Sequence, residues 1–223
     1  SAASDVYKRQ VHTGIDCPVK RAVSPEVICR LMTDRKPLPG KLAFSRDLFV
    51  LLFLLRGMPF VDLAFLRRCD LQGNVITYHR RKTSRKLTVV VGKEAMEIIQ
   101  KYMYAIPDSP YLFPIIQNPG KDEYGQYARM LRLQNYRLTQ VANILGIRDR
   151  LSTYTARHTW ATTALRQNYN SSLICDAMGH SSVKVTETYF QPYRDDEVNR
   201  MNSSLITYIL SKKKRGTDKK IRS

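Results

Sequence analysis

The sequence predicts a mainly α-helical domain with a small antiparallel β-sheet, an α+β fold. Apolar residues recur at helical spacing over most of the chain, and Ser, Pro and Gly stand where helices typically begin and end. Residues 75–91 differ, because they hold two β-rich runs around a polar, basic tip. A length of 223 residues suits one ordinary domain with a small appendage.

The first part of the chain is expected to be helical on either side of this hairpin. Ser24 followed by Pro25 is typical of an N-cap and a first helical position. Gly57 follows a strongly apolar stretch and is expected to end that helix. Residues 36–40 form a loop rich in Pro and Gly. The expected helices are 24–32, 43–56, 59–68 and 92–104.

The hairpin is expected to have strands at residues 75–80 and 87–91, after a turn at 70–74. Residues 107–120 contain four prolines and are expected to form a loop. Beyond it, a helix is predicted at 123–145, and another runs from a cap at Ser152 or Thr153 to 167. A third runs from a cap at Ser171 or Ser172 to Gly179. The last two are a short helix from Ser182 that contains Tyr189 and an amphipathic helix at 201–210.

The charge of the chain points to a polyanionic partner. Of the net charge of +18, residues 211–223 carry +6 and residues 1–10 carry +1, which leaves +11 for residues 11–210. A basic tail alone is weak evidence, but a basic folded body favours a partner such as nucleic acid. A generally basic protein without such a partner is the alternative at this point.

Other features exclude several classes of protein. The four cysteines form no CxxC pair, which argues against a zinc site and fits reduced thiols in the cytosol. The longest apolar run, 48–55, is eight residues, whereas a bilayer-spanning helix needs about 20. The sequence contains no acidic cluster typical of Mg²⁺ sites, no phosphate-binding Gly-rich loop and no serine hydrolase elbow. We therefore expect no metal, no cofactor and no membrane partner.

The ends of the chain are expected to lie outside the folded domain. The first residue is not Met, and residues 5–10, Asp-Val-Tyr-Lys-Arg-Gln, resemble a translation of the transposon end used to prepare sequencing libraries. We treat residues 1–10 as an adaptor scar, so the natural protein is expected to be longer and this chain its C-terminal part. Residues 11–23 are then a linker, 24–210 the folded domain and 211–223 a basic disordered tail.

Six residues in the last third of the chain suggest a site that attacks a phosphate. They are Tyr154 and Arg157, Gly179 and His180, and Thr188 and Tyr189. An arginine can clamp a phosphate, a histidine can hydrogen-bond to it, and a tyrosine can act as the nucleophile. Tyr154 and Arg157 are spaced i, i+3, so one helix can present both to one ligand. His158 is turned about 100° away and is expected to make a buried structural hydrogen bond.

Two basic residues further upstream are candidates for the same site, each with an alternative. Arg56 ends an apolar run and either emerges to solvent or is presented by a rigid helix to a phosphate. Lys82 at the hairpin tip is either a solvated charge or a general acid for a departing 5′ oxygen, a role for which Lys86 is the rival. Tyr189 needs a positive field, because an unperturbed tyrosine is about 0.1% ionised at pH 7; Tyr193 is the alternative nucleophile.

These motifs together resemble the tyrosine recombinase (phage integrase) family, over roughly residues 25–210. The segments that carry the resemblance are Ser45 to Leu63 around Arg56, Tyr78-His-Arg-Arg-Lys-Thr, Ala156-Arg-His-Thr-Trp-Ala-Thr, Met178-Gly-His-Ser-Ser and Thr186-Glu-Thr-Tyr. The resemblance implies the fold of the DNA breaking-rejoining enzymes, and in particular integrases of bacterial mobile elements.

The resemblance also implies a role for each residue. Arg56 and Arg157 would bind the scissile phosphate, Lys82 would protonate the 5′ oxygen, and His180 would hydrogen-bond to the phosphate. Tyr189 would form a 3′-phosphotyrosyl link, whose energy allows a second strand to reverse the step without ATP. Tyr154 stands where the family usually has His or Lys, which affects the expected proton transfer. The residues expected to contact DNA elsewhere are Arg80, Arg81, Lys86, Arg129 and Arg132.

The predicted function is therefore a site-specific DNA recombinase acting on double-stranded DNA in a bacterial cytoplasm, associated with the nucleoid. The alternatives are a type IB topoisomerase-like enzyme that only relaxes DNA, and a truncated DNA-binding module without activity. Family members carry a helical core-binding domain before the catalytic one, of which at most residues 11–23 remain here. The family also exchanges a C-terminal helix in a homo-tetramer on DNA, and residues 201–210 are the candidate.

Overall fold

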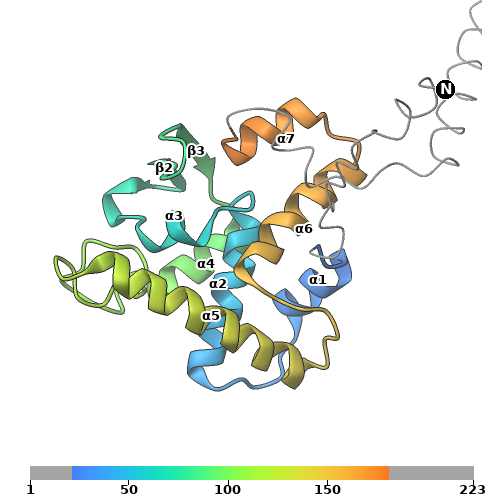
Figure 1. The fold of residues 1–223 in the computed structure, drawn as a ribbon, viewed down its shortest axis with the longest axis horizontal. Helices are drawn as coiled ribbons and strands as arrows, with labels where there is room; N and C mark the ends of the chain where they lie inside the picture. The colour runs from blue at the N-terminus through green and yellow to red at the C-terminus, as the bar shows by residue number, and fades with distance from the viewer. Residues whose placement is uncertain (1–21, 181–223) are drawn as a thin grey trace, which may run out of the picture. The chain divides into compact units, whose positions relative to one another are not determined.

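The computed structural model describes residues 22–180, which form helices around one central helix and a small sheet (Figure 1). The helices are α1 (Pro25–Thr33), α2 (Gly40–Leu54), α3 (Phe60–Ala64), α4 (Lys93–Tyr102), α5 (Glu123–Leu145), α6 (Thr153–Arg166) and α7 (Ser171–Met178), with a short 3-10 turn at Arg68–Asp70. The strands are β1 (Leu71–Gln72), β2 (Val75–His79) and β3 (Lys86–Val90). The predicted α+β class is confirmed.

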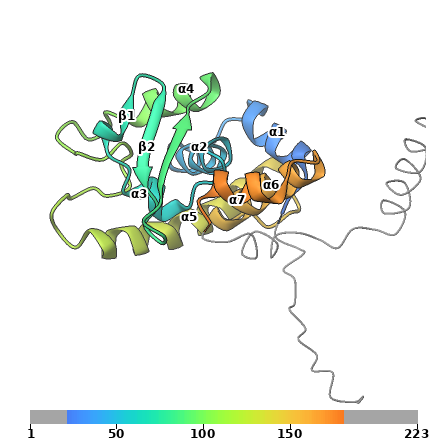
Figure 2. The same cartoon turned by 90° about the horizontal axis from the view of Figure 1, so that it is seen from above.

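Helix α2 is the centre of the fold. Its side chains are buried on every side, as expected of an apolar helix surrounded by others. It packs against α1, α4, α5 and α6, so that most of the other helices lie around it (Figure 2). The helix begins three residues earlier than predicted and ends at Leu54, because Arg56 and Gly57 both adopt a left-handed conformation with φ of 61° and 66°.

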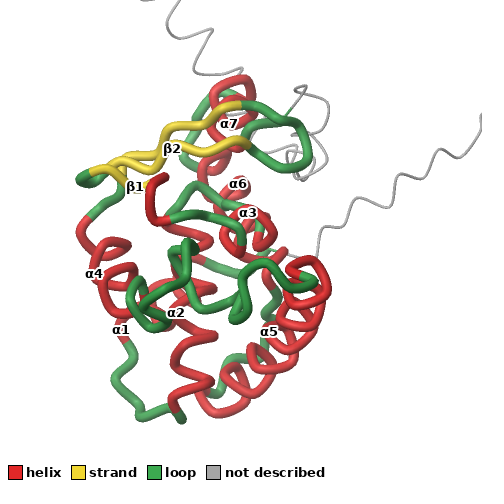
Figure 3. The backbone as a smooth tube through the Cα atoms, turned by 90° about the vertical axis from the view of Figure 1, so that its left-hand side faces the viewer, coloured by secondary structure: helices red, strands yellow, loops and turns green. Residues whose placement is uncertain are grey.

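The sheet is antiparallel, in the order β1-β2-β3. The predicted hairpin is present, with Val75 opposite Val90 and His79 opposite Lys86. The sequence did not predict β1, which pairs with β2 within the stretch expected to be a turn. The hairpin lies at the same end of the domain as α7 (Figure 3). This arrangement brings two segments that are nearly one hundred residues apart to one place.

Most helix ends follow the sequence with small shifts, but α3 ends at Ala64, four residues before the predicted end at residue 68. Ser152 caps α6 and accepts a hydrogen bond from the amide of Thr155. Helix α7 is capped by Asn170, one or two residues before the predicted Ser171 or Ser172. Gly146 and Gly179 end α5 and α7 in the left-handed conformation. The predicted helices around Tyr189 and at 201–210, and the predicted scar and tail, lie outside the described residues. None of the helices between residues 22 and 180 is long and apolar enough to cross a membrane.

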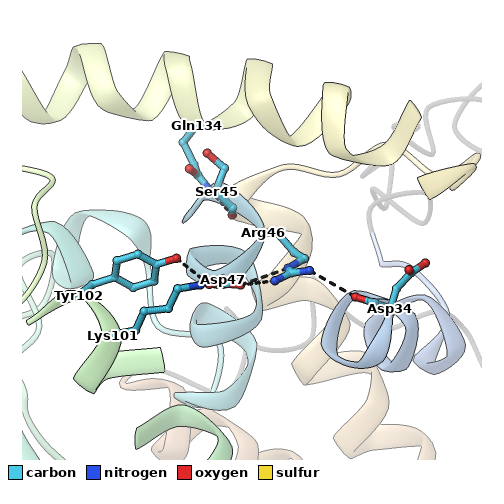
Figure 4. A network of polar contacts seen from close by, with 7 residues as sticks. All are labelled: Asp34, Ser45, Arg46, Asp47, Lys101, Tyr102 and Gln134. Carbon is cyan, nitrogen blue, oxygen red and sulfur yellow. Dashed lines mark hydrogen bonds and ion pairs between the residues drawn. The ribbon is translucent and has the colours of Figure 1, made fainter. Parts of the chain in front are cut away.

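A buried carboxylate ties α2 to its neighbours. Asp47 accepts hydrogen bonds from Arg46, from Lys101 Nζ at 2.8 Å and from the Tyr102 hydroxyl at 2.7 Å (Figure 4). Burial by itself raises the pKa of Asp47, but the hydrogen bonds from Lys101, Tyr102 and Arg46 outweigh it, so the pKa lies below its ordinary value. Nearby, Gln134 on α5 donates to the backbone carbonyl of Ser45 at 2.8 Å.

We predict that Asp47→Asn lowers the free energy of unfolding by about 2 kcal/mol at pH 7, because charge-assisted hydrogen bonds to a buried group are lost. A carboxylate with a lowered folded pKa stabilises the fold fully above its unfolded value of about 3.9 and loses that effect as the pH falls through the folded value. Urea unfolding of the variant and the native chain should therefore converge in acid.

The matched control is Glu97→Gln, which removes the same charge from an exposed position on α4. It should change the unfolding free energy by less than about 0.5 kcal/mol. Equal effects of the two substitutions would contradict the role given to the Asp47 network.

Candidate active site

A pocket of about 350 Å³ opens between α3, the tip of the β2–β3 hairpin, α5, α6 and the end of α7. Three residues with positive charges line it, Arg80, Lys82 and Arg157, against one carboxyl, Asp62. The other lining residues are Pro59, Phe60, Val61, Thr83, Tyr127, Leu131, Thr153, Tyr154 and His180. The pocket thus combines an apolar wall with an excess of positive charge.

Arg157 lines this pocket and is only 3% exposed. Its NH1 donates to the carbonyl of Gly57, and its NH2 donates to the carbonyl of Met178 at 3.0 Å. NH2 also lies 2.7 Å from Nε2 of His180. A buried guanidinium needs such partners, because burying a charge without them is costly. These contacts fix the end of α2, α6 and the end of α7 relative to one another.

Gly57 allows the close approach of α2 to Arg157. A Cβ atom at this position would lie 3.1 Å from Cα of Arg157, closer than nine in ten real contacts of this kind. The residue also adopts a φ of +66°, which an L side chain rarely adopts. The sequence predicted Gly57 only as a helix end, and the contact with Arg157 could not be seen in it.

His180 is 3% exposed and is neutral in this site. Burial lowers its pKa to about 3, and the positive charges of Arg157, Arg80 and Lys82 add to the effect. A guanidinium has only donors, so Nε2 accepts from Arg157 and the ring proton lies on Nδ1. The sequence predicted that this histidine hydrogen-bonds to a phosphate; in the structure, its Nε2 accepts from Arg157.

Lys82 and Tyr154 both line the pocket, and both are exposed. Lys82 lies at the hairpin tip, whereas its rival Lys86 begins β3 and is not among the lining residues. Tyr154 is in the first turn of α6, 47% exposed, and its ring contacts that of His158 edge-on at 4.5 Å. His158 is buried and does not line the pocket, in agreement with its predicted direction.

Arg56 is not brought into this pocket. Its NH1 donates to the carbonyl of Thr88 on β3 at 3.2 Å, and the residue lines a separate groove with Phe53 and Trp160. The physical reason is the early end of α2, since Arg56 lies in a left-handed turn rather than in the last turn of the helix.

Arg80, which was predicted to contact DNA, is only 6% exposed. Its NH1 donates to the carbonyl of Gly179 at 2.6 Å, and its Nε lies 4.0 Å from Oδ2 of Asp62. The alternation of β2 contained the signal, since Ile76, Tyr78 and Arg80 share the buried face. Arg80 therefore belongs to the pocket and not to the exposed surface.

Asp62 was not singled out from the sequence. It is 3% exposed and accepts a hydrogen bond from the amide of Arg81 at 3.0 Å. Burial raises its pKa above the ordinary value, although this hydrogen bond and the charge of Arg80 oppose the shift. The available signal was a single charged residue in the otherwise apolar segment 59–66.

The other predicted DNA contacts are exposed but scattered. The guanidinium of Arg81 lies over the ring of Phe65 at 4.0 Å, near the pocket. Arg129 lines a different pocket on α5 together with Lys41 and Arg137, and Arg132 is exposed on the same helix. Tyr189 and its alternative Tyr193 lie outside the described residues.

Comparison with known proteins identifies the family. A sequence model of the phage integrase family matches residues 22–195, and the chain belongs to this family. The chain is 26% identical over 167 residues to the tyrosine recombinase XerC of Thermodesulfovibrio yellowstonii, which covers 69% of this chain and 52% of that protein. The chain therefore spans about half the length of this curated relative.

Solved structures show the same fold. XerA recombinase has a TM-score of 0.57 at 20% identity, with 82% of this chain and 64% of that chain covered. The Tn1549 transposon integrase in complex with transposon right end DNA has a TM-score of 0.62 at 14% identity, with 83% and 66% covered. XerH bound to its difH substrate has a TM-score of 0.58 at 16% identity, with 83% and 54% covered. The fold is that of a tyrosine recombinase catalytic domain.

We predict that Gly57→Ala destabilises the chain more than Gly73→Ala. Both residues have a positive φ, so alanine costs about 1–2 kcal/mol at each. Only at Gly57 does the added Cβ meet Arg157, which adds about 1–3 kcal/mol, whereas nothing lies within 4 Å at Gly73. Urea unfolding of the two variants measures the difference, and equal losses would contradict the packing of α2 on Arg157.

Proposed function

We propose that this chain is the catalytic part of a site-specific DNA recombinase or integrase, which cleaves and rejoins strands through a 3′-phosphotyrosyl link at Tyr189. The observation that carries the proposal is the buried contact between Arg157 and His180 beside the exposed Lys82 in one positively charged pocket. The DNA-bound relatives named above support DNA as the partner of this family's fold.

The pocket suits a phosphodiester for electrostatic reasons. Arg157 already has its guanidinium desolvated and oriented, so it needs little reorganisation when an anion enters. The three cations that line the pocket repel one another, whereas a bound anion would attract all three. In a site with a lower effective dielectric than water, each of these interactions is stronger than at the surface. Loss of one such donor typically slows a reaction by about 10²–10³-fold.

His180 and Lys82 take the two proton-dependent roles. In the proposal, a bound phosphate competes with Nε2 for Arg157 and raises the pKa of the ring, so that His180 can take up a proton and donate to the phosphate. Lys82, exposed and lining the pocket, protonates the departing 5′ oxygen as general acid. Tyr154 contributes a hydroxyl donor at the rim. It stands where the family usually has His or Lys.

Tyr189 is the proposed nucleophile. It follows His180 by nine residues, which keeps it within about 30 Å of that residue even along an extended chain. The phosphotyrosyl ester retains the energy of the broken bond, so a free 5′-hydroxyl can attack it and restore a phosphodiester. In this scheme cationic side chains take the place of a metal ion in neutralising the transition state.

Arg56 enters the proposal under one condition. To bind the scissile phosphate, its guanidinium must leave the carbonyl of Thr88, an exposed hydrogen bond whose loss costs about 1 kcal/mol. The gain from a charge-assisted bond to phosphate exceeds that cost. Arg81, near the rim of the pocket, is the proposed contact with the flanking DNA backbone.

We further propose that residues 201–210 join protomers into a tetramer on DNA. The groove that Arg56 lines has a volume of about 500 Å³ and a largely apolar wall, with Leu173 57% exposed beside Trp160 and Ile174. An amphipathic helix from a second copy of the chain suits such a groove, because its apolar face would be buried there. Nucleoid association in a bacterial cytoplasm is the setting that this activity implies.

We predict that the chain forms a covalent complex, resistant to SDS, with members of a pool of nicked duplexes of randomised sequence. Because of the nick, cleavage releases a short fragment that carries the 5′-hydroxyl needed to reverse the reaction, so the complex accumulates. Tyr189→Phe should abolish it, because the nucleophilic oxygen is lost, while the matched variant Tyr193→Phe should retain it. EDTA should not change the yield.

Trapping by Tyr189→Phe but not by Tyr193→Phe would show that the nucleophile is misassigned. The native chain and His180→Ala are compared for binding to duplex DNA. If both bind equally and the native chain still forms no covalent complex with any duplex of the pool, the proposed activity is contradicted.

A further inference from the structure

The hairpin tip is joined to the end of α7 through one carbonyl oxygen. Gly179 O accepts a hydrogen bond from Arg80 NH1 at 2.6 Å and another from Thr83 Oγ1 at 3.3 Å. The carbonyls at the C-terminal end of a helix have no partners within the helix, and cationic donors are favourable there. The hairpin supplies those donors from a segment almost one hundred residues upstream.

Arg85 makes a second connection on the exposed side of the hairpin. Its NH1 donates to the carbonyl of His180 at 3.3 Å, and its NH2 lies 3.0 Å from Oδ1 of Asp176. Because both side chains of this ion pair are largely exposed, the pair contributes little by itself. The buried contact of Arg80 is therefore the stronger of the two connections.

The backbone at Gly179 packs closely against side chains of the hairpin, which leaves no room for a side chain there. The residue has a φ of +65°, and a Cβ atom there would lie 2.8 Å from Cδ1 of Leu87 and 3.1 Å from Cδ of Arg80. The aliphatic part of Arg80 thus packs against the backbone that its guanidinium also binds. Rotation of the hairpin away from α7 would break the packing and the hydrogen bonds together.

The other side of Arg80 is fixed by Asp62 on α3. The Nε of Arg80 is 4.0 Å from Oδ2 of Asp62, while Oδ1 of the same carboxyl accepts from the amide of Arg81. Lys82 is the next residue after Arg81. The backbone just before Lys82 is therefore held by α3. Arg80 and Thr83 attach the same hairpin tip to the end of α7.

We propose that Arg80 is a positioning residue, which by linking Asp62 to the carbonyl of Gly179 holds the hairpin tip so that Lys82 faces the pocket. This inference rests on the proposed function, because the role of Lys82 comes from it. Arg80 acts through Lys82: its guanidinium contacts Gly179 and Asp62 of the protein, and it carries neither the attacking nor the departing oxygen.

The test compares Arg80→Lys with Arg81→Lys in the 223-residue chain. Arg80→Lys keeps a positive charge beside Asp62 but loses the fork that reaches Gly179. Arg81→Lys makes the same change one residue away, at an exposed side chain over Phe65. The first readout is amide hydrogen exchange of residues 81–86, which does not depend on catalysis. Exchange should be faster in Arg80→Lys and unchanged in Arg81→Lys.

The second readout is the rate of covalent trapping on a nicked duplex recovered from the randomised pool. We expect Arg80→Lys to slow trapping by about 100-fold, as for a misplaced catalytic group. A matched duplex with sulfur in place of the bridging 5′ oxygen should restore most of the rate. A thiol has a pKa of about 8.5, so the sulfur departs as thiolate without a proton from Lys82.

The inference is overturned if Arg80→Lys leaves the exchange of residues 81–86 as in the native chain, or if it slows the oxygen and sulfur duplexes equally. If Arg80→Lys does not fold, Thr83→Val takes its place, since it removes the second donor to Gly179 O and leaves Asp62 paired. It should speed exchange and slow trapping on oxygen by about fivefold. If the native chain traps no DNA, the proposed function fails and the exchange comparison alone decides this inference.

Discussion

The guanidinium of Arg157 joins three parts of the chain that are distant in sequence. It donates to the carbonyls of Gly57 and Met178 and lies against His180, so the ends of α2 and α7 are both fixed to α6. These partners are neutral. Among the contacts described, no carboxylate forms a direct ion pair with the positive charge of Arg157. A site that must be stable without its ligand and attractive to an anion needs this combination.

The electrostatics of the pocket follow from that constraint. His180 is neutral because burial and three nearby cations disfavour a fourth positive charge. Asp62, the one carboxyl in the pocket, is itself buried and held by the amide of Arg81, so it offsets only part of this field. In the proposed function, a phosphate supplies the negative charge that the pocket lacks. Folding and the proposed phosphate recognition thus depend on the same few groups, and substitutions that loosen α2 or α7 should affect both.

Much of this could be predicted from the sequence, and the failures have physical causes. Local patterns located α5, α6, α7 and the hairpin, and the i, i+3 spacing of Tyr154 and Arg157 places both at the pocket. Arg56 was expected in the last turn of α2, but a left-handed turn, which depends on packing against α6, directs it to Thr88. Arg80 was predicted as a DNA contact. The alternation along β2 indicates that Arg80 is buried, but its contact with Gly179 depends on the docking of the hairpin on α7, which no local pattern encodes.

The most direct test is the protonation state of His180 in the DNA-free chain. Two-dimensional ¹⁵N NMR of the histidine rings, with His180 assigned by comparison with His180→Asn, reports both the charge and the tautomer. We predict a neutral ring with its proton on Nδ1 between pH 8 and pH 5, since burial and the neighbouring cations lower the pKa to about 3 and Nε2 accepts from Arg157. A ring that titrates near the ordinary value of about 6.5, or that carries its proton on Nε2, would contradict the account of the pocket.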